Sequence, residues 1–397
     1  MSERFDTLFS GMSEESAMEI LRTDPGDLDN PGVKYLAATR LGACTSEASL
    51  QRLLETAGDL SDNLYDRITR RKALDALGRR KSPRAIPVLL EALDSADEPM
   101  VVNAADALAR IGCPLTDNQQ DALIQALKGP DNQRRAVIQA FTRLGLSDRN
   151  HAIATCQSDD NPLVSGAAFA HAIRVAGNLA GLEPLIQQLR DDNPGRRRAA
   201  VIDLGDAGEK QALAPLLRCP VSMPLRAKSA FQMTGTDRRT IDDCTAALLD
   251  RLLQDDPRQL DLSENVLTTP NPQAIRDGLQ HRDEARQYAA ARALLEMPAE
   301  LQAPFISELR QTLGSDYGVH YLLASCSGLL GLKGRADLVR DALNESAPQY
   351  AKSRVAAAWS CLRLDLVDQR SCLEHLATTS GWAPLRWSCR RVLEAWA

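Results

Sequence analysis

Residues typical of strands and of membrane spans are scarce in this sequence. Aromatic residues make up 4% of the 397 residues, and the runs of Val, Ile, Tyr and Thr that favour strands are missing. Ala, Leu, Arg and Gln recur throughout and favour helices. Nowhere do about 18 apolar residues follow one another without a charge, which is the length that a membrane-spanning helix needs. These absences exclude an all-β protein and a transmembrane protein.

Sequence motifs of common enzymes and of secretion are missing as well. There is no G-x-x-x-x-G-K-[ST], no G-x-G-x-x-G after a strand, and no H-E-x-x-H. The nine cysteines include no C-x-x-C pair, and their odd number and helical surroundings predict buried, reduced thiols. The acidic N-terminus lacks the basic stretch and apolar core of a secretion signal. We therefore expect a cytoplasmic protein.

The charge balance argues against nucleic acid as a partner. Lys and Arg number 47 and Asp and Glu number 53, so the net charge is -6. A protein that binds nucleic acid without sequence preference carries an excess of basic residues. This sequence carries a small acidic excess instead, so we expect no nucleic-acid partner.

The chain is built from a repeat of about 32 residues, the kind of period that indicates stacked units. The tetrapeptide Asp159-Asp160-Asn161-Pro162 returns as Asp191-Asp192-Asn193-Pro194. Prolines and glycines follow the same period, at Pro99, Pro130, Pro162, Pro194 and Pro224, and at Gly42, Gly78, Gly112, Gly145 and Gly177. Each unit reads as an Asn-Pro or acidic turn, a helix closed by Gly, and a second helix.

These units predict an all-α fold, a curved α-solenoid of about ten HEAT-like helix pairs. No unit can bury its apolar face alone, so neighbouring units must stack. None of the five histidines is followed by Glu, which excludes the deoxyhypusine hydroxylases, HEAT-repeat enzymes whose metal is held by His-Glu pairs. We therefore predict no metal site.

The repeat divides the chain into four segments. Residues 1–30 are predicted to form a helical cap, 31–235 an N-terminal HEAT-like array, 236–282 an irregular repeat or hinge, and 283–397 a C-terminal array with its own cap. In the last segment the period is 33 residues, and helices are expected to begin at Asp283, Asp316, Gln349 and Trp382. Equivalent positions within those helices are held by Tyr288, Tyr321, Arg354 and Trp387.

Clusters of arginine are the first candidates for a binding site. They include Arg70, Arg71, Arg134 and Arg197, and three of the clusters open the first helix of a repeat. One interpretation is that these side chains pair with Asp of the adjacent repeat. The other is that a few of them clamp the carboxylates of a ligand, which the planar guanidinium suits.

A group of aromatic and imidazole side chains is the second candidate. Tyr317, His320 and Tyr321 have i, i+3 and i+4 spacing, so they are expected to share one face of a helix. A phenol and an imidazole together can relay a proton near neutral pH. The alternative is an aromatic plug between repeats, and Cys326, on the opposite face, is expected in the core.

Tryptophan is concentrated near the C-terminus. Trp359, Trp382, Trp387 and Trp396 all lie in the last 50 residues, together with Tyr350. Such a group is typical of the hydrophobic plug that closes a solenoid. An exposed indole, for which we select Trp359, would instead stack on a flat ligand.

Three segments carry a resemblance to a known family. MSERFDTLFSGMS at the N-terminus, residues 65–94 and residues 193–235 are similar to the E/F-type phycobilin lyases of cyanobacteria, and most of all to the longer single-chain members that act on phycoerythrin. The resemblance implies an enzyme that binds a linear tetrapyrrole and attaches it through a thioether to a cysteine of a phycobiliprotein subunit. The nucleophile then belongs to the partner, which agrees with a sequence that has no nucleophile motif.

Under this resemblance each candidate residue acquires a role. Tyr317, His320 or Tyr321 would deliver the proton, while Arg70, Arg71, Arg134 and Arg197 would bind the two propionates and Trp359 would contact the bilin. The expected substrate is phycoerythrobilin, with no permanently bound cofactor. The expected partner is a phycoerythrin subunit, and the α subunit is preferred over the β subunit.

Three other functions stay open at this stage. Some family members also isomerise the bilin to phycourobilin, but Gly318 after Tyr317 offers no further acid or base and favours a plain lyase. The chain can instead be a non-enzymatic HEAT-repeat scaffold or chaperone for a phycobiliprotein. A HEAT-like DNA glycosylase would need a basic face, which the net charge disfavours.

Overall fold

The computed structural model describes residues 11–397 of the chain. The first ten residues, which belong to the predicted cap and to the N-terminal segment of the family resemblance, lie outside the described residues. The described part contains 23 α-helices, α2 to α24, and short 3₁₀ helices between them, and it contains no strand. The structure therefore confirms the predicted all-α fold of HEAT-like helix pairs. None of the helices in these residues has the length and apolar character needed to cross a bilayer.

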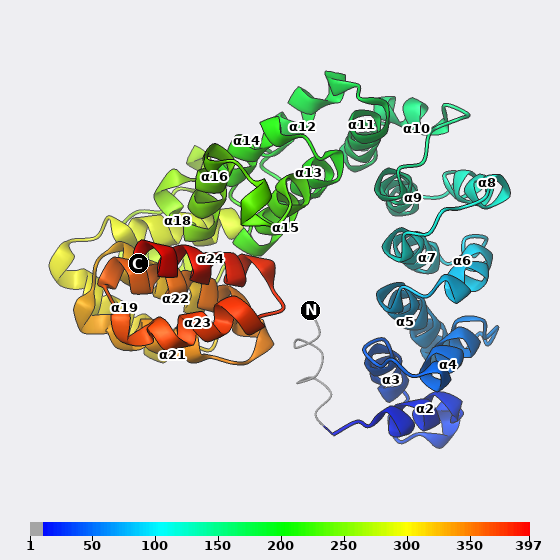
Figure 1. The fold of residues 1–397 in the computed structure, drawn as a ribbon, viewed down its shortest axis with the longest axis horizontal. Coiled ribbons are helices and arrows are strands. Elements are labelled where there is room, and N and C mark those ends of the chain that lie inside the picture. Colours follow the sequence, from blue (N-terminus) through cyan, green and yellow to red (C-terminus); the bar gives the residue numbers. More distant parts are fainter. Residues whose placement is uncertain (1–10) are drawn as a thin grey trace. The chain divides into compact units, whose positions relative to one another are not determined.

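The chain divides into two compact units, residues 11–181 and Leu182–Ala397 (Figure 1). The division falls inside the segment 31–235 that the sequence predicts as one array. Segment 236–282, the predicted irregular repeat, lies wholly within the C-terminal unit.

The N-terminal unit is a double row of helices (Figure 1). Each helix of the first row packs on the next, and the helices of the second row pack behind them. The first row consists of α3 (Val33–Leu41), α5 (Leu64–Arg80), α7 (Glu98–Ile111), α9 (Asp131–Leu144) and α11 (Pro162–Ala176). The others are α2 (Glu14–Arg22), α4 (Glu47–Ala57), α6 (Ile86–Ala92), α8 (Asp117–Ala126) and α10 (Ala152–Thr155).

The predicted turn chemistry accounts for most helix ends in this unit. Asn161 caps α11 by accepting a hydrogen bond from the Leu163 N–H, and Pro162 is its first residue. Gly112 and Gly145 end α7 and α9 with φ of 71° and 67°, in the left-handed region. Gly78 differs from the prediction, because α5 continues past it to Arg80. A Cβ at Gly78 would lie 2.7 Å from the Ala107 Cα, so this glycine allows α5 and α7 to approach closely.

The C-terminal unit repeats the double row but adds a helix that crosses it. α13 (Pro194–Ala207) packs on α15 (Met223–Thr234), and α18 (Glu284–Leu295), α20 (Tyr317–Leu329), α22 (Ala351–Leu364) and α24 (Ala383–Ala395) pack successively on one another. The shorter partners are α12 (Leu182–Gln188), α14 (Leu213–Arg218), α17 (Pro272–Leu279), α19 (Ala299–Leu313), α21 (Ala336–Asn344) and α23 (Arg370–Thr379). The crossing helix, α16 (Asp243–Gln254), packs on α15 and also on α22 and α24.

The 33-residue period in the last segment has a direct structural consequence. Asp283, Asp316 and Trp382 are the N-cap residues of α18, α20 and α24, as predicted, while Gln349 lies in the 3₁₀ turn before α22. Three of the equivalent positions face the same element: the Tyr288 and Tyr321 hydroxyls donate hydrogen bonds to Asp255, directly after α16, and the Trp387 Nε1 donates to Asp250 at 2.8 Å. The period therefore places one side chain from each of these helices against α16 and its C-cap.

A buried charged network joins four helices at the end of α16. Arg226 of α15 is 1% exposed and forms an ion pair with Asp255, which is 3% exposed. Arg226 also donates to the carbonyls of Val221 at 2.7 Å and Leu217 at 2.6 Å. The Tyr288 hydroxyl donates to the other Asp255 oxygen at 2.7 Å, and burial raises the pKa of Tyr288 well above its usual value. Each polar atom of Asp255 therefore has a partner, as a buried carboxylate requires.

Removing one member of this network tests how much it contributes to the free energy of unfolding of the C-terminal unit. Arg226→Met leaves a buried carboxylate without its counter-charge, so we expect the C-terminal unit to lose about 3–5 kcal/mol of stability. All four tryptophans lie in this unit, so urea unfolding followed by tryptophan fluorescence reports on it alone. Arg239→Ala, which breaks an exposed ion pair with Asp237, is the control and should leave the urea midpoint nearly unchanged. Equal effects of the two substitutions would contradict the prediction.

Candidate functional site

Two of the four predicted arginines, Arg71 and Arg134, form ion pairs between successive repeats. Arg71 of α5 donates to both oxygens of Asp97, the N-cap residue of α7, at 2.7 and 2.8 Å. Arg134 of α9 pairs with Asp159, shortly before α11. This is the first of the two interpretations that the sequence left open, with Arg and Asp of adjacent repeats paired across the stack.

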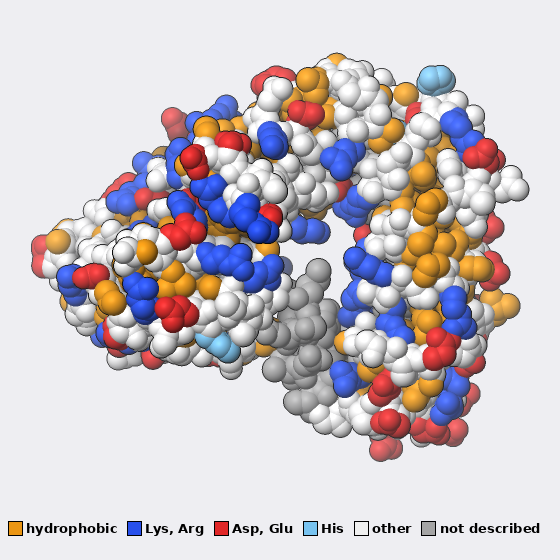
Figure 2. Space-filling view, viewed as in Figure 1, with side chains coloured by type: hydrophobic (Ala, Val, Ile, Leu, Met, Phe, Trp, Pro, Cys, Tyr) orange, Lys and Arg blue, Asp and Glu red, His pale blue; other side chains and the backbone are white. Residues whose placement is uncertain are grey.

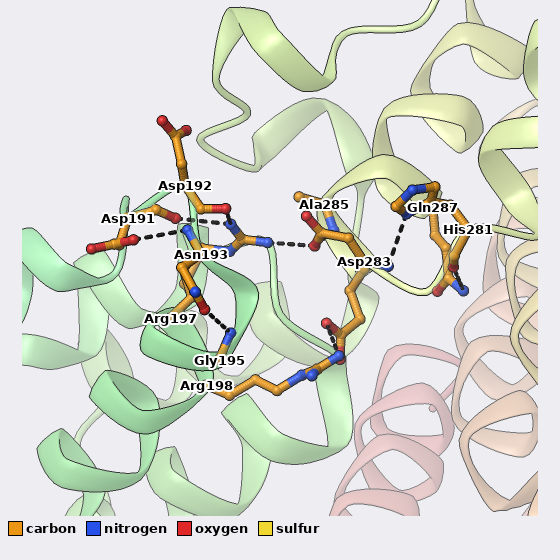
Figure 3. Close-up of polar contacts among 12 residues, drawn as sticks. Asp191, Asp192, Asn193, Gly195, Arg197, Arg198, His281, Asp283, Ala285 and Gln287 are labelled. Atoms are coloured by element: carbon orange, nitrogen blue, oxygen red, sulfur yellow. Dashed lines mark hydrogen bonds and ion pairs between the residues drawn. The ribbon is translucent and has the colours of Figure 1, made fainter. Parts of the chain in front are cut away.

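Arg197 also pairs with a helix-capping Asp, but this Asp lies 86 residues further along the chain rather than in the next repeat (Figure 3). Arg197 is 3% exposed, pairs with the N-cap residue Asp283 of α18, and donates to the carbonyls of Asp191 at 2.8 Å and Asp192 at 3.1 Å. Its neighbour Arg198 binds both oxygens of Glu284, at 3.1 and 2.7 Å. The ion pairs of Arg197 and Arg198 join α13 to the first turn of α18. In Figure 2, basic and acidic side chains are interspersed over the region of α12 to α16.

The other two predicted bilin contacts are also engaged inside the chain. Arg70 is 8% exposed and donates to the Ser61 carbonyl at 2.7 Å. Trp359 is 4% exposed, and its Nε1 donates to the Ser388 hydroxyl at 3.0 Å. A bilin at any of the five residues would have to displace such internal contacts. Their bilin-binding role stays a prediction, and the contacts show what each side chain does for the fold.

Tyr317 and His320 come together with a third aromatic residue, Tyr350. The Tyr350 ring meets the Tyr317 ring edge to face, with 5.1 Å between centroids, and the His320 ring with 4.7 Å. Tyr317 is 49% exposed, whereas His320 is 6% exposed. The cluster therefore presents one accessible phenol beside a buried imidazole at the start of α20. Tyr350 was grouped with the terminal tryptophans in the sequence, and only the structure shows its place in this cluster.

The environment of His320 holds its ring neutral. Burial, followed by the nearby positive charge of Arg310, lowers its pKa from the usual 6.5. Its Nδ1 lies 2.9 Å from the Ser353 hydroxyl on α22. Because the Ser353 hydroxyl can donate as well as accept, this contact fits either neutral tautomer.

Tyr321 lies apart from this pair. Its hydroxyl donates to Asp255 in the buried network, and burial raises its pKa well above the usual value. The helical spacing predicts that Tyr317, His320 and Tyr321 share one face. In the structure Tyr321 points into the core instead and is 3% exposed. One helical residue corresponds to about 100° of rotation, which is enough to turn Tyr321 from the cluster of His320 toward α16.

No sequence pattern indicates a recess next to Tyr321. Residues of α15, α18, α20 and α22 border a partly open recess, whose space of about 270 Å³ includes open solvent. Tyr288 and Tyr321 line it, and Glu284, Gln287 and Lys352 bring polar groups to it. The Lys352 Nζ lies 5.2 Å from the centre of the Tyr321 ring. Lys352 belongs to none of the charge clusters that the sequence singles out, which is why it was missed.

The buried cysteines are poor nucleophiles, because their surroundings disfavour the thiolate. All nine are free. Cys219, Cys326, Cys361 and Cys389 are buried, and burial raises the pKa of each thiol to about 12. The prediction of buried thiols, including Cys326 in the core, is confirmed for these four and is wrong for Cys244, which is exposed. Within residues 11–397, no cluster of three or more His, Cys, Asp or Glu is placed to hold a metal ion.

Comparison with known proteins shows what this chain is similar to. A model of HEAT repeats matches residues 60–142. An uncharacterized phycocyanin operon protein Y from Pseudanabaena tenuis is 28% identical over 90% of this chain and 86% of its own length. The bilin biosynthesis protein CpeY from Synechococcus is 24% identical over 83% of this chain and 81% of its own. Over most of its length the chain is therefore similar to proteins named for bilin biosynthesis and the phycocyanin operon.

A solved structure shows the same fold. In the complex of CpcE and CpcF of a phycocyanin lyase from Nostoc, one chain matches with a TM-score of 0.53 and 22% identity, over 60% of this chain and 93% of that chain. The family resemblance based on three sequence segments is thus confirmed. Because the two relatives align with more than four fifths of this chain, the E/F-type similarity includes residues of both units.

The buried His320 makes a pH-dependent contribution to stability. Its folded-state pKa is below 6.5, so the unfolded chain binds more protons than the folded chain as the pH falls below about 6.5. The free energy of unfolding therefore falls with pH in that window, by about 1.4 kcal/mol for each unit of pKa difference. His320→Gln should flatten this part of the profile, measured by urea unfolding at about pH 5 and about pH 7.5. The exposed His375→Gln is the control, and an unchanged profile for His320→Gln would contradict the assignment.

Proposed function

We propose that this chain is a bilin lyase that attaches a linear tetrapyrrole to a cysteine of a phycobiliprotein subunit. The observation that carries the proposal is the similarity to the protein Y and CpeY relatives over more than four fifths of the chain. The HEAT-repeat fold shared with a chain of the CpcE and CpcF complex supports it. We further propose phycoerythrobilin as the substrate and the phycoerythrin α subunit as the acceptor, because the resembling family members are the longer, phycoerythrin-directed ones.

The chemistry asks for no nucleophile from this chain. The thiolate of the acceptor cysteine adds to the ethylidene of ring A, so that one C–S bond forms and the C=C bond is lost. A proton is delivered to the conjugated system, which balances the proton lost by the thiol. The buried, protonated thiols of this chain agree with a reaction in which the acceptor subunit supplies the nucleophile. The lyase contributes orientation of the two reactants and an acid, and the bilin leaves bound to its acceptor, so no permanent cofactor is needed.

The geometry favours Tyr317 as the acid among the three predicted residues. Tyr317 is half exposed at the start of α20, where a bound bilin can reach its hydroxyl. His320 packs on the same Tyr350 ring as Tyr317, so it would help to position the phenol. The Tyr321 hydroxyl already donates to Asp255 in the core, and its part in the proton delivery requires that network to open.

Co-expression tests the proposed function. The chain is produced together with the enzymes that make phycoerythrobilin and with a phycoerythrin α subunit. The subunit is then run on a denaturing gel, stained with zinc, and its absorbance is recorded. Fluorescence that survives denaturation and depends on this chain supports the lyase. Absorbance of phycourobilin in place of phycoerythrobilin would support the lyase-isomerase alternative, and no covalent pigment on any subunit despite ample bilin would favour a scaffold or chaperone.

Substitution at the aromatic cluster tests the proposed acid. Tyr317→Phe and His320→Gln should each lower the rate of bilin attachment, by about 10²- to 10⁴-fold for loss of a general acid, while the helical circular dichroism stays unchanged. Tyr35→Phe is the matched control, because Tyr35 is a similarly exposed tyrosine in the N-terminal unit, at 41%. Full activity of both Tyr317→Phe and His320→Gln would remove the assignment.

A further inference from the structure

Lys352 is a cation without a counter-charge among the described residues. Its ammonium lies 5.2 Å from the centre of the Tyr321 ring, and no hydrogen bond or ion pair joins it to another described residue. The carboxylates whose charges act on it are those of Asp316, Asp255 and Glu284. The recess beside Lys352 therefore contains a positive charge that the protein itself leaves unpaired.

Each of these three carboxylates already has other partners. Glu284 accepts two hydrogen bonds from Arg198, and Asp255 accepts from Arg226, Tyr288 and Tyr321. Asp316 caps α20 by accepting from the N–H groups of Gly318 at 2.8 Å and Val319 at 3.0 Å. The acidic groups around the recess are thus held in place and are not available to move to Lys352.

The position of Lys352 is unfavourable for a cation in the isolated chain. It is the second residue of α22, where the partial positive charge of the helix N-terminus repels a cation. Burial lowers its pKa from the usual value. Both effects cost free energy, and a ligand anion in the recess would offset them.

We propose that this recess binds one carboxylate group, with the Lys352 ammonium as its counter-charge. Gln287 supplies a second donor, because its amide nitrogen has two N–H groups and uses one for the His281 carbonyl at 2.8 Å. Rings of Tyr288 and Tyr321 form the apolar wall. Bidentate or charge-assisted contacts of this type are the strong ones in proteins.

The size of the recess restricts what enters it. It is a shallow recess that is partly open, and its space of about 270 Å³ includes open solvent in front of it. The end of a short carboxylate side chain can enter it from the open side, whereas a tetrapyrrole ring system stays outside. The inference rests on the proposed function for its ligand, since two sources of such a carboxylate are then at hand, a propionate of the bilin and an Asp or Glu side chain of the acceptor subunit.

Binding of phycoerythrobilin and of its dimethyl ester to the purified full chain separates these sources. Lys352→Gln should weaken binding of the free acid by about 10- to 100-fold, from loss of a charged contact, and leave binding of the ester unchanged. Lys333→Gln, an exposed lysine of the same unit, carries the same charge change and should alter neither. Binding is followed by the bilin absorbance, and Lys352→Arg should recover part of the affinity.

The outcomes distinguish the site from the function. Loss of affinity for the free acid alone assigns the recess to a propionate. Unchanged bilin binding with weakened binding of the apo-subunit assigns it to a carboxylate of the acceptor. If Lys352→Gln changes neither while the wild-type chain binds bilin and attaches it, the recess proposal is wrong and the lyase stands. If the wild-type chain binds no bilin and attaches none, the proposed function is wrong. If, in addition, the Lys352→Gln chain binds the apo-subunit as tightly as the wild-type chain does, the proposed carboxylate site is wrong as well.

Discussion

The ion pair between Arg226 and Asp255 is the contact on which the C-terminal unit depends. It ties α15 to the end of the crossing helix α16, and through Tyr288 and Tyr321 it also reaches α18 and α20. A charge pair this deeply buried is stable only when all its hydrogen-bonding groups are satisfied, and here two backbone carbonyls and two phenols complete it. The recess that holds Lys352 lies directly against this network, so its shape is set by the same contact.

Arginine has two different tasks in this chain. Arg71 and Arg134 join one repeat to the next by pairing with an Asp near the start of the following long helix. Arg197 joins α13 to the more distant α18 through Asp283. At the end of α16, Arg226 holds helices that belong to different parts of the unit. In both places the guanidinium is already paired with a carboxylate of the protein. The Lys352 ammonium has no such partner, so it is more readily available to a ligand carboxylate.

Much of the fold was predictable from the sequence, because helix caps and the repeat period depend on residues that are close together in the chain. Asn161 with Pro162, Gly112 and Gly145 end or begin helices where the sequence placed them, and the 33-residue period put Tyr288, Tyr321 and Trp387 at equivalent positions. What those side chains face was not predictable. Asp250 lies 137 residues from Trp387 in the sequence, and no spacing rule relates them. Contacts between residues that are distant in the sequence also place Tyr321 in the core instead of the predicted cluster, and they place Lys352 beside the recess.

The claim that this chain joins a bilin to another protein's cysteine has a direct chemical test. The purified chain is mixed with phycoerythrobilin and the apo-α subunit of phycoerythrin, and the tryptic peptides of both proteins are analysed by mass spectrometry. The account predicts a mass gain of one bilin on one cysteine peptide of the subunit, only when the chain is present, and none on the chain's own nine cysteines. A bilin carried covalently by this chain, or an equal adduct without it, would contradict the account.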